Sequence, residues 1–155
     1  MSEGPARGRP QPLDPSVNDW RDRHAPSLDD IEALARDAFD RLPPEFRALC
    51  GNLVIRVEEF PTDEVLREMG LASPFDLLGL FQGVGLAQSG TVYTGRMPNM
   101  VFLYRRPILD YWAEYEEALG KLVTHVLVHE IGHHFGLSDE DMAEVEAMAE
   151  QEERR

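Results

Sequence analysis

The segment 121–135 constrains the fold of this chain more than any other stretch. Its apolar residues recur at helical spacing and cover much of the circumference of the helix that they predict: Leu122, Val123, Val126, Leu127, Ile131 and Phe135. A helix of this kind is buried, so the rest of the domain has to pack around it. The same segment holds four of the five histidines of the chain. A buried helix rarely carries several histidines without a use for them.

The length and charge limit what the chain can do. A chain of 155 residues with 43% hydrophobic residues fits one domain with one core. Its formal net charge of -14 argues against partners such as nucleic acid or an anionic membrane, because both require a basic face. Cys50 is the single cysteine, so it cannot form an internal disulfide, and we expect it to be a small buried hydrophobe.

Neither a secretion signal nor a membrane span is expected from the sequence. The first twenty residues lack the apolar segment that secretion requires, and no later stretch has the uninterrupted apolar length that spans a bilayer. We therefore expect a cytoplasmic protein. Residues 1–25 are rich in Pro, Gly and Arg and predict a disordered tail, residues 26–150 a single domain, and residues 151–155 a second short tail.

Local signals place most of the secondary structure in the first half of that domain. Ser27 is a plausible N-cap, with Asp30 at the third position of a helix that the prolines at 43 and 44 stop. Residues 53–58 alternate in a way typical of a half-buried strand, and a short helix is expected from a Thr62 cap to Gly70.

The second half continues with glycine-rich strands. Residues 77–98 contain five glycines among short apolar pieces, which favours strands joined by tight turns. Residues 100–104 form an apolar run that predicts a central, buried strand. Pro107 can begin a helix that carries Leu119 and ends near Gly120. After Gly136, Ser138 with Asp141 predicts a capping box for a last helix to about residue 150.

The spacing of the histidines points to a metal. His129 and His133 are four residues apart, so on a helix their rings lie on one face about 6 Å apart and can converge on one ion. Glu130 stands beside the first histidine, where it can accept a proton from water activated by zinc. These three residues satisfy the pattern H-E-x-x-H.

The third ligand is open between two interpretations, because a catalytic zinc ion usually takes three protein ligands. In the first, Gly136 turns the chain and Asp139 returns to the metal. In the second, an acid of the following helix binds it, and the candidates are Glu146, Glu150 and Glu153.

Three neighbours of the motif have simpler expected roles. His125 lies one turn before His129 and could flank the site, although a structural role is favoured. His134 points away from His133, so we expect it to hydrogen-bond to a neighbouring segment. Met142 follows the motif too closely for a methionine turn and is expected to be a core contact.

The stretch "HEIGHHFGLSDEDM" resembles the signature of small bacterial zincin-like metallopeptidases with a minimal zincin fold. The pieces "LLGLFQGVGL" and "MVFLYRRPI" and the amphipathic opening helix agree, so the resemblance spans residues 27–148. It implies an α+β domain in which a small, mostly antiparallel or mixed sheet packs against helices, including the active-site helix. It also implies a zinc site at His129, His133 and Asp139, with Glu130 as general base. The chain departs from the metzincin pattern, because Asp139 stands where histidine is commoner and no clear methionine turn follows.

The leading functional hypothesis is a zinc peptidase with one bound ion and a peptide or protein substrate. A chain of this size has little material for deep pockets, so we expect a cleft along a sheet edge that holds an extended peptide. One alternative is a zinc hydrolase that acts on a bond other than the peptide bond. Another is a non-catalytic module that has kept the metal and the fold and binds a partner protein.

Overall fold

The computed structural model describes residues 19–83 and 98–153. The predicted N-terminal tail up to residue 18, the glycine-rich segment 84–97 with its predicted turns, and the last two residues lie outside the described residues. Within the predicted tail, η1 (Asp19–Arg21) forms one turn of 3-10 helix.

The described part of the chain contains a mixed sheet of three strands in the order β1-β3-β2. β1 (Leu53–Glu58) pairs in parallel with β3 (Asn99–Tyr104), and β2 (Gly79–Gln82) pairs with β3 in antiparallel fashion. β3 is therefore central, and its Val101 and Leu103 side chains are fully buried. The predicted small sheet and the predicted central strand are both confirmed.

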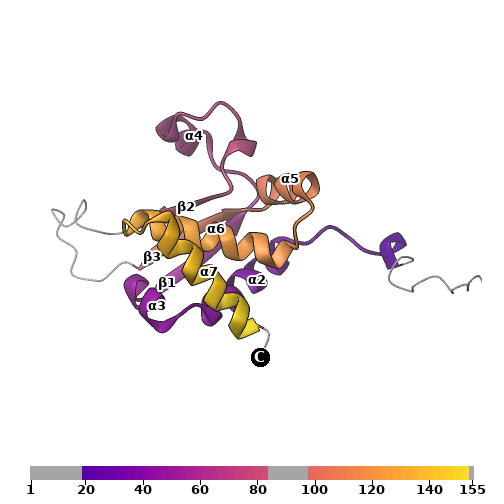
Figure 1. Cartoon of the computed structure of the whole chain (residues 1–155). Coiled ribbons are helices and arrows are strands. Elements are labelled where there is room, and N and C mark those ends of the chain that lie inside the picture. Colours follow the sequence, from indigo (N-terminus) through magenta and orange to yellow (C-terminus); the bar gives the residue numbers. More distant parts are fainter. Residues whose placement is uncertain (1–18, 84–97, 154–155) are drawn as a thin grey trace, which may run out of the picture.

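Six α-helices and a second 3-10 turn complete the described fold. They are α2 (Leu28–Arg41), α3 (Pro44–Cys50), α4 (Asp63–Met69), η2 (Pro74–Asp76), α5 (Arg105–Tyr115), α6 (Leu119–His134) and α7 (Asp139–Glu153). Together with the sheet they form the α+β architecture that the sequence predicts (Figure 1). No helix in the described ranges combines the length and the apolar character needed to cross a membrane.

The predicted helix caps form as expected. Ser27 Oγ accepts a hydrogen bond from the Asp30 backbone N–H at 3.1 Å, and the Asp30 carboxylate accepts one from the Ser27 N–H at 2.9 Å. Thr62 Oγ1 caps α4 by accepting from Val65 N–H at 3.1 Å. These bonds satisfy N–H groups that have no partner within the helix, which is why the sequence marks both starts so clearly.

Two helix boundaries differ from the prediction. α5 ends at Tyr115, because Glu116 adopts a left-handed backbone conformation with φ of 49°; the predicted end near Gly120 is wrong. Leu119 and Gly120 instead begin α6. The two prolines after α2 were expected only to stop it, yet α3 starts at Pro44, where the first position of a helix needs no N–H donor.

α6 lies at the centre of the packing. It contacts β2 and β3 on the sheet as well as α2, α5 and α7. α2 packs against both β1 and α6, so α2 and α6 share one face of the sheet, and α7 packs against both of these helices (Figure 1). The predicted burial of this helix is confirmed by its fully or nearly fully buried residues: Leu122, Val123, Val126, Leu127, Val128, Ile131 and Gly132.

β2 approaches α6 closely at Gly79. A Cβ atom at this buried position would lie 2.9 Å from Val126 Cγ1, 3.0 Å from the carbonyl oxygen of Phe102 and 3.2 Å from Glu130 Cγ. Real Cβ atoms essentially never come as close to a neighbouring atom as this one would to Val126 Cγ1, and the contact with the carbonyl oxygen is tighter than nine in ten real ones, so the position favours glycine. The absence of a side chain lets the strand lie directly beside the part of α6 that carries Glu130.

We expect Gly79→Ala to destabilise the fold by about 1–3 kcal/mol, because the added methyl group has to push β2 away from α6. Urea denaturation followed by circular dichroism measures this change. Gly120→Ala is the matched control, since the nearest atom to its Cβ would lie at an ordinary 3.8 Å and alanine favours the helix. A Gly79→Ala protein as stable as the control would contradict the packing described above.

Candidate metal centre

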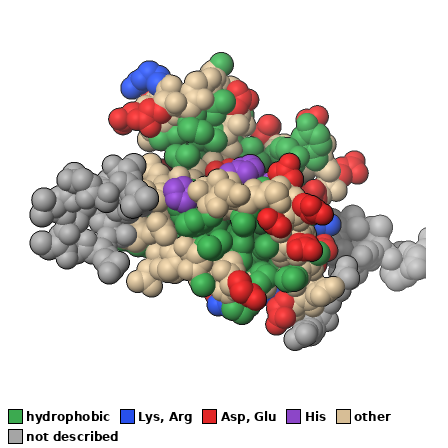
Figure 2. All heavy atoms as spheres, turned by 60° about the vertical axis from the view of Figure 1, so that its left-hand side comes forward, with side chains coloured by type: hydrophobic (Ala, Val, Ile, Leu, Met, Phe, Trp, Pro, Cys, Tyr) green, Lys and Arg blue, Asp and Glu red, His purple; other side chains and the backbone are tan. Residues whose placement is uncertain are grey.

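Three histidines form a row along one face of α6. His125, His129 and His133 follow at intervals of four residues. The ring centroids of His125 and His129 are 4.0 Å apart, and those of His129 and His133 are 5.6 Å apart. Figure 2 shows histidine side chains reaching the surface, close to acidic side chains and below the part of the molecule that carries α4 in Figure 1.

The turn after α6 directs the acidic helix α7 back against α6. Gly136 adopts φ of 76°, a conformation that suits glycine, and its N–H donates to the carbonyl of His133 at 3.2 Å. The N–H of Leu137 donates to the carbonyl of Gly132 at 2.9 Å, which completes a Schellman motif. Ser138 Oγ then accepts from the N–H of Asp141 at 3.0 Å and starts α7, which packs against α6.

Met142 fixes α7 against α6. Its side chain is fully buried, and a Cβ atom on Gly132 would lie only 2.4 Å from its sulfur atom. The glycine inside the H-E-x-x-H segment therefore provides the space in which α7 is seated. This arrangement confirms Met142 as a core contact.

Glu146 of α7 bridges the first two histidines of the row. One carboxylate oxygen lies 3.1 Å from Nδ1 of His125, and the other lies 3.0 Å from Nε2 of His129. Each of the three residues offers a ligand atom, and these atoms all lie within 4.8 Å of one another. Neighbouring ligand atoms of tetrahedral zinc lie about 3.3 Å apart, which is close to the two nitrogen–oxygen distances of this cluster.

The surroundings of His129 favour the neutral form of its imidazole. Burial lowers the pKa of His129, and the neighbouring His125 lowers it further, while Glu146 acts in the opposite direction. A lowered pKa keeps the imidazole neutral near pH 7. A neutral imidazole has the free electron pair that a metal ligand needs.

The cluster opens into a cavity between α6, α7 and the end of α2. Its volume is about 860 Å³. Its wall includes His125, His129, Asp139 and Glu146, together with Thr124. Small side chains, mainly alanines of α7, line much of the remainder. A ligand can therefore reach the imidazoles and the Glu146 carboxylate from solvent.

The expected ligands occupy different positions relative to this cluster. His129 belongs to it, and His133 is exposed at the next turn of α6. Asp139 is exposed in the first turn of α7 and lines the same cavity, without a hydrogen bond to either histidine. The assignment of His133 and Asp139 as ligands therefore stays a prediction.

Among the alternative acids, the structure brings Glu146 to the histidines. Glu150 lies one turn further and pairs with Lys121 at 3.2 Å, and the side chain of Glu153 is outside the described residues. His125 was expected to be structural, yet it joins the cluster. Its spacing of four residues before His129 is the signal that could have indicated this.

Glu130 lies on the sheet side of α6. It is half-buried and has no hydrogen-bond partner among the residues that the structure describes. Burial raises the pKa of Glu130 to about 7. Its charge also contributes, after burial and Glu58, to raising the pKa of Tyr104 on β3 to about 12. A carboxyl group whose pKa is near 7 can both accept and release a proton at neutral pH.

His134 has a packing role. Its ring lies 4.2 Å from the ring of Phe81 and 4.9 Å from that of Phe135, measured between centroids. A hydrogen bond from His134 to a neighbouring segment was expected, and the described residues show ring contacts in its place. His134 therefore ties the end of α6 to the end of β2.

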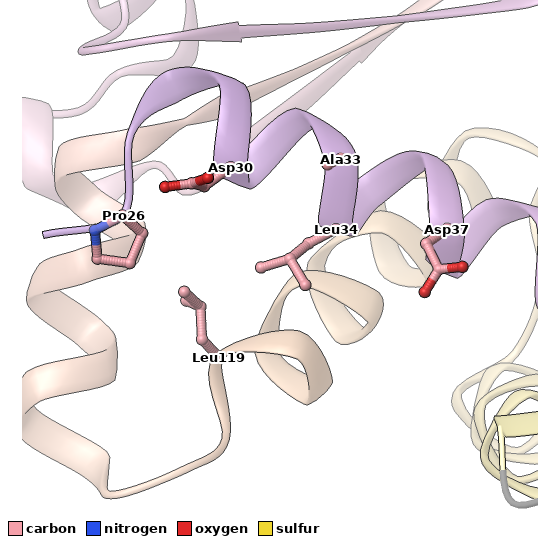
Figure 3. Close-up of a pocket in the computed structure, with 6 residues that line it drawn as sticks. All are labelled: Pro26, Asp30, Ala33, Leu34, Asp37 and Leu119. Atoms are coloured by element: carbon pink, nitrogen blue, oxygen red, sulfur yellow. The ribbon is translucent and has the colours of Figure 1, made fainter. Parts of the chain in front are cut away.

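A second pocket lies between the starts of α2 and α6 (Figure 3). Its two acids are already engaged, since Asp30 closes the capping box of α2 and Asp37 pairs with Arg41. The rest of its wall is apolar and consists of Pro26, Ala33, Leu34 and Leu119. This pocket offers no group for chemistry.

A family model described as zincin-like metallopeptidase matches residues 50–149. The chain belongs to this family. The match includes α6, the turn at Gly136 and most of α7, and thus every residue of the histidine cluster. No curated protein gives a significant match to the chain. Zincin-like proteins bind zinc, and the two histidines and the glutamate of this member are a donor set that fits that ion.

In the metal-free zincin-like chain, we expect Glu130→Gln to increase stability at high pH. The pKa of Glu130 is about 7 in the folded protein and near 4.5 in the unfolded one, so ionisation favours unfolding as the pH rises through this window. The variant should match the parent protein at pH 4 and exceed it at pH 8 by about 1–2 kcal/mol, after a reduction for solvent screening.

Urea denaturation at several pH values in the presence of chelator measures the difference. Glu144→Gln, which changes an exposed acid of α7, should show little dependence on pH. A difference between the Glu130→Gln and parent proteins that stays constant from pH 4 to pH 8 would contradict the raised pKa.

Proposed function

We propose that the chain is a zinc-dependent peptidase in which Glu130 is the general base. The observation that carries this proposal is the position of a half-buried carboxyl group, with a pKa of about 7, next to His129 on a helix with a row of histidines. Membership in the zincin-like metallopeptidase family supports the same reading.

The residues divide the work in the following way. His129 and His133 hold the ion, with Asp139 as the proposed third ligand. Zinc, when bound, activates water and polarises the scissile carbonyl group. The Glu130 carboxylate accepts a proton from the attacking water and then donates it to the nitrogen of the leaving amine. A pKa of about 7 suits both steps, because the group then exchanges its proton readily at neutral pH.

The substrate is proposed to be an extended peptide. β2 is the end strand of the sheet within the described residues, and Gly79 keeps it close to Glu130. A peptide that pairs with a strand edge gains backbone hydrogen bonds without a deep pocket. The acidic charge of the chain favours neutral or basic peptides over anionic ones.

Glu130→Gln should reduce peptidase turnover by a factor of roughly 10²–10⁴, because the amide cannot accept the proton. Its zinc content should not change. Digestion of a broad peptide library, analysed by mass spectrometry with and without chelator, measures the turnover, and Glu144→Gln is the control on an exposed surface.

Two results would count against the proposal. A Glu130→Gln protein that cleaves as fast as the parent would show that Glu130 is not the general base. A parent protein that cleaves no peptide at any zinc loading would favour a binding module that has the fold and the metal without turnover.

For the third ligand, we expect Asp139→Ala to lower the peptidase rate at limiting zinc by at least about tenfold, because the catalytic ion would lose a charged donor. Glu150→Ala should leave the rate within about twofold, since Glu150 pairs with Lys121 on the surface. Steady-state assays with the most rapidly cleaved library peptide measure both. The opposite pattern would move the third ligand from Asp139 to Glu150.

A further inference from the structure

His125 has no part in the proposed reaction, yet it is one of the most specifically placed side chains on α6. Its Nδ1 atom faces one oxygen of Glu146, and Nε2 of His129 faces the other. Two imidazoles from successive turns of one helix thus converge on a single carboxylate of the next helix. The H-E-x-x-H pattern does not require this arrangement.

The geometry is that of a metal site as well as a hydrogen-bonded triad. Nitrogen and carboxylate oxygen are preferred zinc ligands, and the three ligand atoms lie within 4.8 Å of one another. The 860 Å³ cavity borders all three residues, so an ion has an entry path and an open position for water. Met142 and the turn at Gly136 hold α7 in place, so core contacts fix the position of Glu146 relative to the two histidines.

We propose that His125, His129 and Glu146 form a second zinc site. This upstream site lies one helical turn before the site of the motif pair, His129 and His133, and shares His129 with it. Nε2 of His129 faces Glu146, and one ring nitrogen binds one ion. An ion at this upstream site therefore takes His129 away from His133. The upstream site is a resting position for zinc that competes with the catalytic position, and this competition rests on the proposed function.

The upstream site is tested in a variant that lacks His133, the second histidine of the motif pair. The full chain carrying His133→Ala loses an exposed side chain and should keep its fold, which circular dichroism checks. We expect it to bind zinc in competition with a chromophoric chelator. Adding His125→Ala should weaken this binding by at least about tenfold, because one of three ligands is lost. The matched control adds Thr124→Ala, which removes a neighbouring cavity side chain that offers no imidazole.

Three results would overturn the proposal. The His133→Ala protein could fail to bind zinc while it stays folded. The further change at His125 could weaken binding by less than about tenfold, or by no more than the change at Thr124 does. The parent chain could take up two zinc ions of similar affinity, which would contradict the sharing of His129. None of these experiments measures peptidase activity. The proposed function can therefore fail while the upstream site stands, and the reverse also holds.

Discussion

The burial of α6 between the sheet and two other helices is the constraint on which the rest of the structure depends. The helix must supply core residues to β2, β3, α2 and α7 and must also present polar side chains to solvent. It meets both demands because its aliphatic residues point into the core, whereas its row of histidines lies on a face that is open to solvent. The spacing of four residues keeps those imidazoles in register over two turns.

The position of α7 turns this row into a candidate metal centre. A Schellman turn at Gly136 reverses the chain, and Met142 packs over Gly132, so the angle of α7 is set by core contacts. Glu146 consequently faces His125 and His129. On the sheet side of α6, Glu130 remains half-buried without a hydrogen-bond partner among the described residues, and this arrangement raises its pKa at a cost in stability. A stability cost of this kind is typical of groups retained for chemistry.

The features that could be predicted from the sequence depend on local interactions. The buried helix, the central strand and the caps at Ser27 and Thr62 are encoded by periodicity and by single side chains, and all of them form. The end of α5 could not be predicted, because apolar spacing continues across the left-handed residue Glu116. α3 was missed since prolines can begin a helix as well as end one.

In the candidate site, too, the part that depends on local sequence could be predicted and the part that depends on helix packing could not. The pattern of His129, Glu130 and His133 lies on one helix, so the sequence alone indicates a zinc site there. Which acid meets the histidines depends on the packing angle between α6 and α7, and acids spaced along α7 cannot be ranked by sequence. The structure brings Glu146 to His125 and His129, whereas Asp139 stays a prediction.

The central claim is that imidazoles of α6 bind zinc, and His129 is common to the motif pair and to the cluster with Glu146. Zinc titration of purified, metal-free protein, parent and His129→Ala, tests this most directly. The account predicts that the parent chain takes up one zinc ion and that the His129→Ala chain, still folded, loses tight binding. A parent chain that binds no zinc, or a His129→Ala chain that binds it as tightly as the parent, would contradict the account.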